Sequence, residues 1–134
     1  LSLEKAVMEN ILAQINKEKQ NVVIDTTGSV VHTGENICNE LKQKSLVVYI
    51  EAGEDMKELM FKKYIKKPKP VVFGDVFDIK KNETPKEALK RCYKELLNLR
   101  SALYTEYADI IIPHEKIGKN RSAQQFISLI GQSL

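Results

Sequence analysis

Three short apolar runs, separated by helix-forming sequence, constrain the fold of this chain more than any other feature. The runs are Asn21–Asp25, Leu46–Ile50 and Asp109–Ile112. Each is apolar in consecutive positions rather than in alternate ones, which is typical of parallel strands buried on both faces. Strands that alternate with helices predict an α/β fold in three layers, with a parallel sheet between two layers of helices.

Helical periodicity fills most of the sequence between these runs, because apolar residues recur there at three- and four-residue spacings. Thr84, Pro85 and Glu87 form the pattern of a capping box with proline in the first turn, which predicts the start of a long helix. The remaining segments have no such period and contain turn residues. The expected helices are 3–18, 33–44, 53–66, 84–104 and 121–133, and the expected loops are 26–29, 67–83 and 114–120.

Composition limits the class of protein. A chain of 134 residues with 43% hydrophobic residues fits one domain, residues 1–134, with a real core. A net charge of +3 is well below the basic density of a nucleic-acid binder. The sequence contains neither a membrane-spanning apolar run nor an apolar signal core. Cys38 and Cys92 lack metal-ligand spacing, and we interpret them as reduced thiols of a cytoplasmic protein, which we expect to be a monomer.

The segment Asp25–Ser29 follows the first apolar run, and ligands of parallel sheets lie at the carboxyl ends of the strands. Asp25 is a candidate Mg²⁺-site residue, because an aspartate after a buried strand often lies near the metal in nucleotide-binding folds. Gly28 would let backbone N–H groups approach an anion closely. The alternative is a plain turn, since all these residue types favour turns.

Arg100 is one of three arginines among 21 basic residues, near the end of the long predicted helix. The fixed fork of a guanidinium suits two-point recognition of a carboxylate or a phosphate better than an ammonium does. The alternative interpretation is an arginine that caps the helix or lies on its surface.

Residues 67–83 form a lid-like insertion in our interpretation, because lysines and prolines cluster there without a helical period. Lys69 precedes a rigid, partly apolar stretch and is a candidate for supplying positive charge to a transferring group. For Lys62 and Lys63 a solvated helix face is the better interpretation.

Several catalytic signatures are missing from the sequence. It contains no Gly-x-Gly-x-x-Gly, no Cys-x-x-Cys and no Gly-x-x-x-x-Gly-Lys-Ser/Thr loop. His32 and His114 share no ligand spacing, and we interpret both as loop histidines rather than catalysts.

Taken together, these segments resemble the shikimate kinase family over about 110 residues. The most specific match is the closing signature, an arginine, three residues, a tyrosine and then Glu-x-Ala-Asp. The matching residues are Asp25–Val31, Glu35–Asn36, Val47–Ala52, Lys69–Val72, Arg100, Tyr104, Glu106, Ala108 and Asp109.

The resemblance implies a P-loop kinase fold of the nucleoside-monophosphate-kinase type. Such an enzyme transfers the γ-phosphoryl group of ATP to the 3-hydroxyl of shikimate with Mg²⁺, a step of aromatic amino acid biosynthesis, mainly by positioning and charge neutralisation.

Matching positions carry the family's roles over to this chain. Arg100 would bind the shikimate carboxylate, and Gly28 and Ser29 would hold the ring hydroxyls. Lys69 would replace the lid arginine that meets the phosphates. Asn120 and Arg121 would belong to the loop that flanks adenine.

The chain departs from the family pattern in several places. The phosphate-binding loop and its strand are absent, the Phe-Arg pair is absent, the glycine triad is Thr27-Gly28-Ser29, and the lid arginine is a lysine. The family's phosphate-loop strand lies between the strands that correspond to 21–25 and 46–50. Because the chain begins with Leu1, we expect about 35–45 further residues upstream, the size of a missing βαβ portion.

Three hypotheses follow for the function. In the first, the chain is part of a shikimate-kinase-like phosphotransferase and is inactive without a phosphate-binding loop. In the second, it is a non-catalytic relative that binds a small acid or a protein. In the third, it belongs to a kinase with a different small acceptor.

Overall fold

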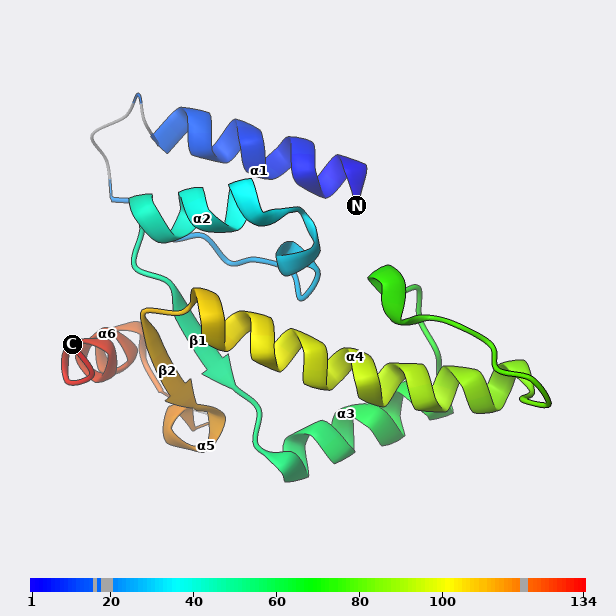
Figure 1. The fold of residues 1–134 in the computed structure, drawn as a ribbon. Coiled ribbons are helices and arrows are strands. Elements are labelled where there is room, and N and C mark those ends of the chain that lie inside the picture. Colours follow the sequence, from blue (N-terminus) through cyan, green and yellow to red (C-terminus); the bar gives the residue numbers. More distant parts are fainter. Residues whose placement is uncertain (16, 18–20, 119–120) are drawn as a thin grey trace.

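The computed structural model describes residues 1–15, 17, 21–118 and 121–134. Within these ranges, helices outnumber strands, and the chain path is shown in Figure 1. The elements in order are α1 (Ser2–Ile15), the 3₁₀ turn η1 (Val30–His32), α2 (Glu35–Lys44), β1 (Val48–Glu51), α3 (Glu54–Lys66), the 3₁₀ turn η2 (Gly74–Val76), α4 (Pro85–Tyr107), β2 (Ile110–Pro113), α5 (His114–Ile117) and α6 (Ala123–Gly131).

The sheet consists of β1 and β2, which pair in parallel with Val48 opposite Ile110. Asp109 fixes this register from just outside the strand: its carboxylate accepts a hydrogen bond from the Val47 N–H at 2.9 Å, and its own N–H donates to the Val47 carbonyl at 2.9 Å. Ile110 and Ile112 are buried on one face of the sheet. The parallel pair, joined through two helices, confirms the α/β class expected from the sequence.

The first expected strand, Asn21–Asp25, does not form. Residues 21–27 have no regular secondary structure, and Val23 is 96% exposed. A strand is stabilised by the hydrogen bonds of a neighbouring strand, and the part of the chain that the structure describes places none beside this segment. The local sequence favours a strand here, but a strand forms only where a neighbouring strand supplies hydrogen-bond partners.

Most expected helices are present, and the differences lie at their ends. The capping box at the start of α4 is confirmed: the Glu87 N–H donates to Thr84 Oγ1 at 3.3 Å, and the Thr84 N–H donates to the Glu87 carboxylate at 2.9 Å. The expected loop 114–120 was wrong in its first half, because His114–Ile117 forms the short helix α5 directly after Pro113.

The core is divided between two clusters. One joins α1, η1 and α2 through Met8, Leu12, Val30 and Ile37. The other joins α3 and α4 through Tyr64, Tyr93 and Leu96, with partly buried side chains from segment 67–83 packed against it, namely Val71, Phe73 and Val76. The expected lid-like segment is therefore held against α4 by apolar contacts.

No helix within the described residues is long and apolar enough to span a membrane.

Candidate functional site

The candidate site lies where the loop 25–29 approaches the C-terminal half of α4. The Arg100 guanidinium, half-buried, is its centre. Its Nη2 donates to the Val72 carbonyl at 2.8 Å, and its Nε donates to His32 Nε2 at 3.2 Å. Arg100 therefore does not cap α4 or extend into solvent, because two segments distant in sequence fix its orientation.

Gly28 lies directly against this guanidinium. A Cβ at position 28 would lie 3.3 Å from Arg100 Nη1 and 3.4 Å from the Tyr104 hydroxyl. The Tyr104 hydroxyl also donates a hydrogen bond to the Gly28 carbonyl, 76 residues away in sequence. Tyr104 of the closing signature thus holds the loop by a hydrogen bond, and Arg100 lies so close to Gly28 that a Cβ there would make a tight contact.

The hydroxyl groups on either side of Gly28 are bound to α1. Ser29 Oγ donates to Glu4 Oε2 at 2.7 Å, and Thr27 Oγ1 donates to Glu4 Oε1. The two hydroxyls also lie 3.0 Å apart. The Glu4 carboxylate therefore fixes the loop conformation and occupies the Ser29 hydroxyl, which sequence analysis had assigned to substrate.

Burial and charge shift the pKa values of groups in this site. Burial raises the pKa of the Tyr104 hydroxyl, which therefore stays a neutral donor at physiological pH. Burial, and then the positive charge of Arg100, lower the pKa of His32, so that its imidazole is neutral as well. The positive charge next to Gly28 is thus that of Arg100, which suits a carboxylate or a phosphate.

The other predicted site residues are not brought together with Arg100. Lys69 and Asp25 are exposed, and Arg121 donates from Nε to the Ile117 carbonyl at 2.8 Å. Asn120 lies outside the described residues. Their assigned roles toward phosphate, metal and adenine therefore stay predictions.

A Mg²⁺ site requires several oxygen ligands close together. Among the residues that the structure describes, no three His, Cys, Asp or Glu side chains are grouped so that they could hold a metal ion. Asp25 alone does not provide a metal site.

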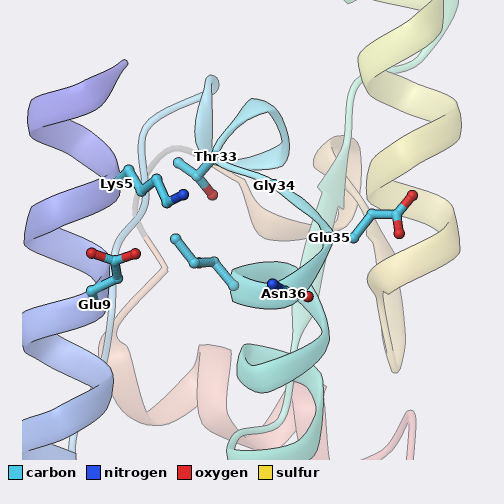
Figure 2. A pocket seen from close by; sticks show the side chains of 7 residues that line it. Lys5, Glu9, Thr33, Gly34, Glu35 and Asn36 are labelled. Atoms are coloured by element: carbon cyan, nitrogen blue, oxygen red, sulfur yellow. The ribbon is translucent and has the colours of Figure 1, made fainter.

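An open hollow of about 330 Å³ lies between α1 and the start of α2 (Figure 2). Its lining includes the Glu35-Asn36 pair of the family resemblance. Figure 2 shows Lys5 extending from α1 toward Thr33, whose hydroxyl donates to the Val30 carbonyl at 2.6 Å. The remaining lining residues are Glu9, Gly34 and Ile37.

Sequence reasoning missed three components of the site: His32, Glu4 and the Val72 carbonyl. His32 follows the loop by three residues, and this proximity was its only sequence signal. Glu4 gave no signal, because its role depends on how α1 packs. Val72 belongs to the matching segment Lys69–Val72, but the sequence did not predict that its carbonyl would bind Arg100.

These observations define an α/β domain with a single arginine presented to a glycine-containing loop, an arrangement suited to a small anionic ligand. A protein-family comparison agrees: the model for shikimate kinase matches residues 2–131. The chain belongs to the shikimate kinase family.

Curated relatives named shikimate kinase are similar over most of this chain. The protein from Alteromonas mediterranea is 27% identical over 127 residues, which are 95% of this chain and 65% of that protein. Those from Aeromonas salmonicida and Histophilus somni are 28% and 29% identical over 92% and 91% of this chain, covering 63% and 61% of their own lengths. The chain thus spans less than two thirds of these relatives. No solved structure matches it significantly.

Proposed function

We propose that this chain is the acceptor-binding part of a shikimate-kinase-like phosphotransferase. Completed by a phosphate-binding loop from outside these 134 residues, it would transfer the γ-phosphoryl group of ATP to shikimate. The observation that carries the proposal is the contact between Arg100 and Gly28, in which the Nη1 edge of an oriented guanidinium lies so close to the loop that a Cβ at position 28 would be 3.3 Å from it.

The residues of the chain have distinct parts in the proposal. Arg100 binds the acid group of the acceptor through charge-assisted hydrogen bonds, which fixes the ring relative to the loop. Tyr104 holds the loop at the Gly28 carbonyl. Glu4 holds the Thr27 and Ser29 side chains from behind. ATP with Mg²⁺ supplies the phosphoryl group when bound, and Lys69 on segment 67–83 provides positive charge toward it.

The fold also supports a position for the completing segment. Residues 21–25 have no regular secondary structure and no strand partner among the described residues, in which β1 pairs with β2 on one side only. The carboxyl end of a strand placed between them would lie beside the loop 25–29. This agrees with the family pattern, in which the phosphate-loop strand separates these two segments.

A different acceptor is the second candidate, and one observation favours it. The Ser29 and Thr27 side chains fill positions that the family gives to glycine, and their hydroxyls are bound to Glu4. They leave less room for a substituted ring. A smaller hydroxy acid would still find Arg100, so a panel of such acids separates the two candidates.

The first test is shikimate binding by the 134-residue chain, followed by ¹H–¹⁵N NMR. We expect shifts at residues 27–32 and 100–104. Arg100→Ala should weaken binding by about 10- to 100-fold, the value of a charge-assisted hydrogen bond. Lys86→Ala removes a positive charge from the exposed start of the same helix and should not weaken it. Equal losses of affinity in Arg100→Ala and Lys86→Ala would mean that net charge alone causes the effect, and would contradict the role of Arg100 in acid binding.

The second test concerns the phosphoryl donor. Because the sequence contains no Gly-x-x-x-x-Gly-Lys-Ser/Thr loop, the chain alone should show no Mg²⁺-dependent ATP turnover with shikimate. Added in trans, a segment that carries such a loop should restore turnover. Turnover by the purified chain alone would contradict the need for completion.

A further inference from the structure

His32 contacts Arg100 from a position that the proposed chemistry does not use. The residue ends η1, three positions after Ser29, and its own N–H donates to the Ser29 carbonyl at 2.9 Å. Its Nε2 accepts the hydrogen bond from Arg100 Nε at 3.2 Å. The loop that contacts Arg100 through Gly28 therefore leads directly into η1, whose last residue accepts a hydrogen bond from the arginine.

Hydrogen bonds occupy two of the three guanidinium nitrogens. Nε is bound to His32 and Nη2 is bound to the Val72 carbonyl at 2.8 Å, so that the plane of the guanidinium is set by η1 and by segment 67–83 together. Nη1 is the nitrogen that borders Gly28. Removing the contact at Nε would let the guanidinium rotate about its Nη2 contact, away from Gly28.

The tautomer of His32 follows from this geometry. An imidazole nitrogen that accepts a hydrogen bond carries no proton, so the proton of neutral His32 is on Nδ1. Nδ1 is directed toward Gly74 of η2, where a Cβ would lie 3.3 Å from it at a backbone φ of +60°. The His32 ring thus binds Arg100 of α4 at one nitrogen and lies next to Gly74 of η2 at the other.

We propose that His32 is a positioning residue for Arg100: in its neutral, Nδ1-protonated form it holds the guanidinium with Nη1 turned toward Gly28. The effect of His32 on acid binding rests on the proposed function, but the hydrogen bond between His32 and Arg100 does not. Protonation of Nε2 removes the acceptor and places two positive charges side by side, so the contact is lost in acid.

Other charges near His32 modify its titration. Arg100 on α4 opposes protonation, and Glu4 on α1 favours it, with burial as the largest influence. Segment 67–83 places only uncharged groups near His32, namely the Val72 carbonyl and the Gly74 backbone. Because burial and Arg100 outweigh Glu4, the pKa of His32 is lowered, and the accepting form is present at pH 7.

The test uses two variants, His32→Gln and His32→Ala, of the 134-residue chain. Gln offers an amide oxygen near the position of Nε2 and does not titrate, whereas Ala offers no acceptor. The direct readout is the NMR signal of the Arg100 Nε–H group, assigned by its loss in Arg100→Lys. At pH 7.5 we expect slow proton exchange in the wild type and in His32→Gln, and fast exchange in His32→Ala. As the pH falls through the lowered pKa of His32, protection of the Nε–H group relative to the intrinsic exchange rate at each pH should be lost in the wild type and should persist in His32→Gln.

Shikimate affinity provides a second readout. His32→Ala should bind about three- to tenfold more weakly than the wild type, the value of one hydrogen bond, and His32→Gln should remain within twofold. Slow Nε–H exchange in His32→Ala, or fast exchange in His32→Gln, would overturn the positioning role. If no variant and no wild type binds shikimate, the proposed function fails, and the exchange readout still decides the role of His32.

Discussion

Arg91 binds Glu83 through two parallel hydrogen bonds, with Nε 2.9 Å from Oε1 and Nη2 2.8 Å from Oε2. The same guanidinium also contacts the carbonyl of Asp78 at 3.1 Å and its carboxylate at 3.0 Å. One arginine of α4 thus binds two points near the end of segment 67–83. The lid-like segment is anchored at this end, whereas the Lys69 end has no comparable ion pair among the described residues.

Replacing Arg91 should loosen this anchor. Arg91→Ala removes the paired contact, and Arg91→Lys keeps the charge but loses the two-point geometry. We expect faster amide exchange at Lys80 and Glu83 in both variants, with the larger change for Ala. Lys90→Ala, an exposed neighbour, is the matched control and should leave these amides unchanged. Equal amide exchange at Lys80 and Glu83 in Arg91→Lys and in the wild type would show that the positive charge alone holds segment 67–83.

The same pair predicts a pH dependence of stability. The hydrogen bond from Arg91, then that from the Lys80 N–H, lowers the pKa of Glu83 to about 2 from the ordinary 4.5. A lowered pKa stabilises the fold at pH values above 4.5, and this contribution is lost as the pH falls toward 2. In urea unfolding, the difference between wild type and Glu83→Gln should therefore shrink between pH 5 and pH 2.5. A difference that stays constant over this range would contradict the ion pair.

Gly28→Ala tests the close contact at the candidate site. The added Cβ would lie 3.3 Å from Arg100 Nη1 and 3.4 Å from the Tyr104 hydroxyl, so the guanidinium must shift by a few tenths of an ångström. We expect weaker shikimate binding without loss of folding. Gly131→Ala is the matched control, because a Cβ there meets nothing within 4 Å. The affinity of both variants for shikimate is measured by NMR titration. Equal losses of affinity in the two variants would contradict the site.

The two cysteines should be inert in the folded protein. Cys92 is fully buried and Cys38 is 4% exposed, and burial raises the pKa of the Cys38 thiol. Since the thiolate is the reactive form, a thiol reagent should label neither cysteine at pH 8 before unfolding and both after it. Labelling of Cys38 in the native state would show that the α1–α2 cluster opens readily.

The sequence allowed prediction of the features that depend on local pattern. Thr84 and Glu87 identified the start of α4, because a capping box is formed by neighbouring residues. Gly28 and Arg100 were singled out separately, one in the loop after the first apolar run and the other in the closing signature, and their contact in space was not predicted. The strand expected at Asn21–Asp25 failed, because a strand needs a partner that local sequence does not supply. Glu4 could not have been predicted, because its role arises from the packing of a separate helix.

The core of α4 provides the last prediction. Leu96 is fully buried beside Tyr64 and Tyr93, whose rings stack with centroids 3.8 Å apart. Leu96→Ala leaves a cavity in this cluster and should lower the free energy of unfolding by about 2–5 kcal/mol. Leu99, one turn further along the same helix, is 39% exposed, so Leu99→Ala makes the same chemical change with a loss of less than about 1 kcal/mol.

The pair Leu96→Ala and Leu99→Ala also tests how segment 67–83 is held. Because Val71 and Phe73 pack against the Leu96 cluster, Leu96→Ala should expose this segment to protease at lower urea concentration than the wild type, and Leu99→Ala should not. Equal losses of stability of Leu96→Ala and Leu99→Ala in urea would mean that Leu96 and Leu99 are buried to the same extent, contrary to the structure. A stability loss confined to Leu96→Ala with unchanged proteolysis would mean that the Arg91 anchor alone holds the segment, since apolar packing would then contribute nothing to its position.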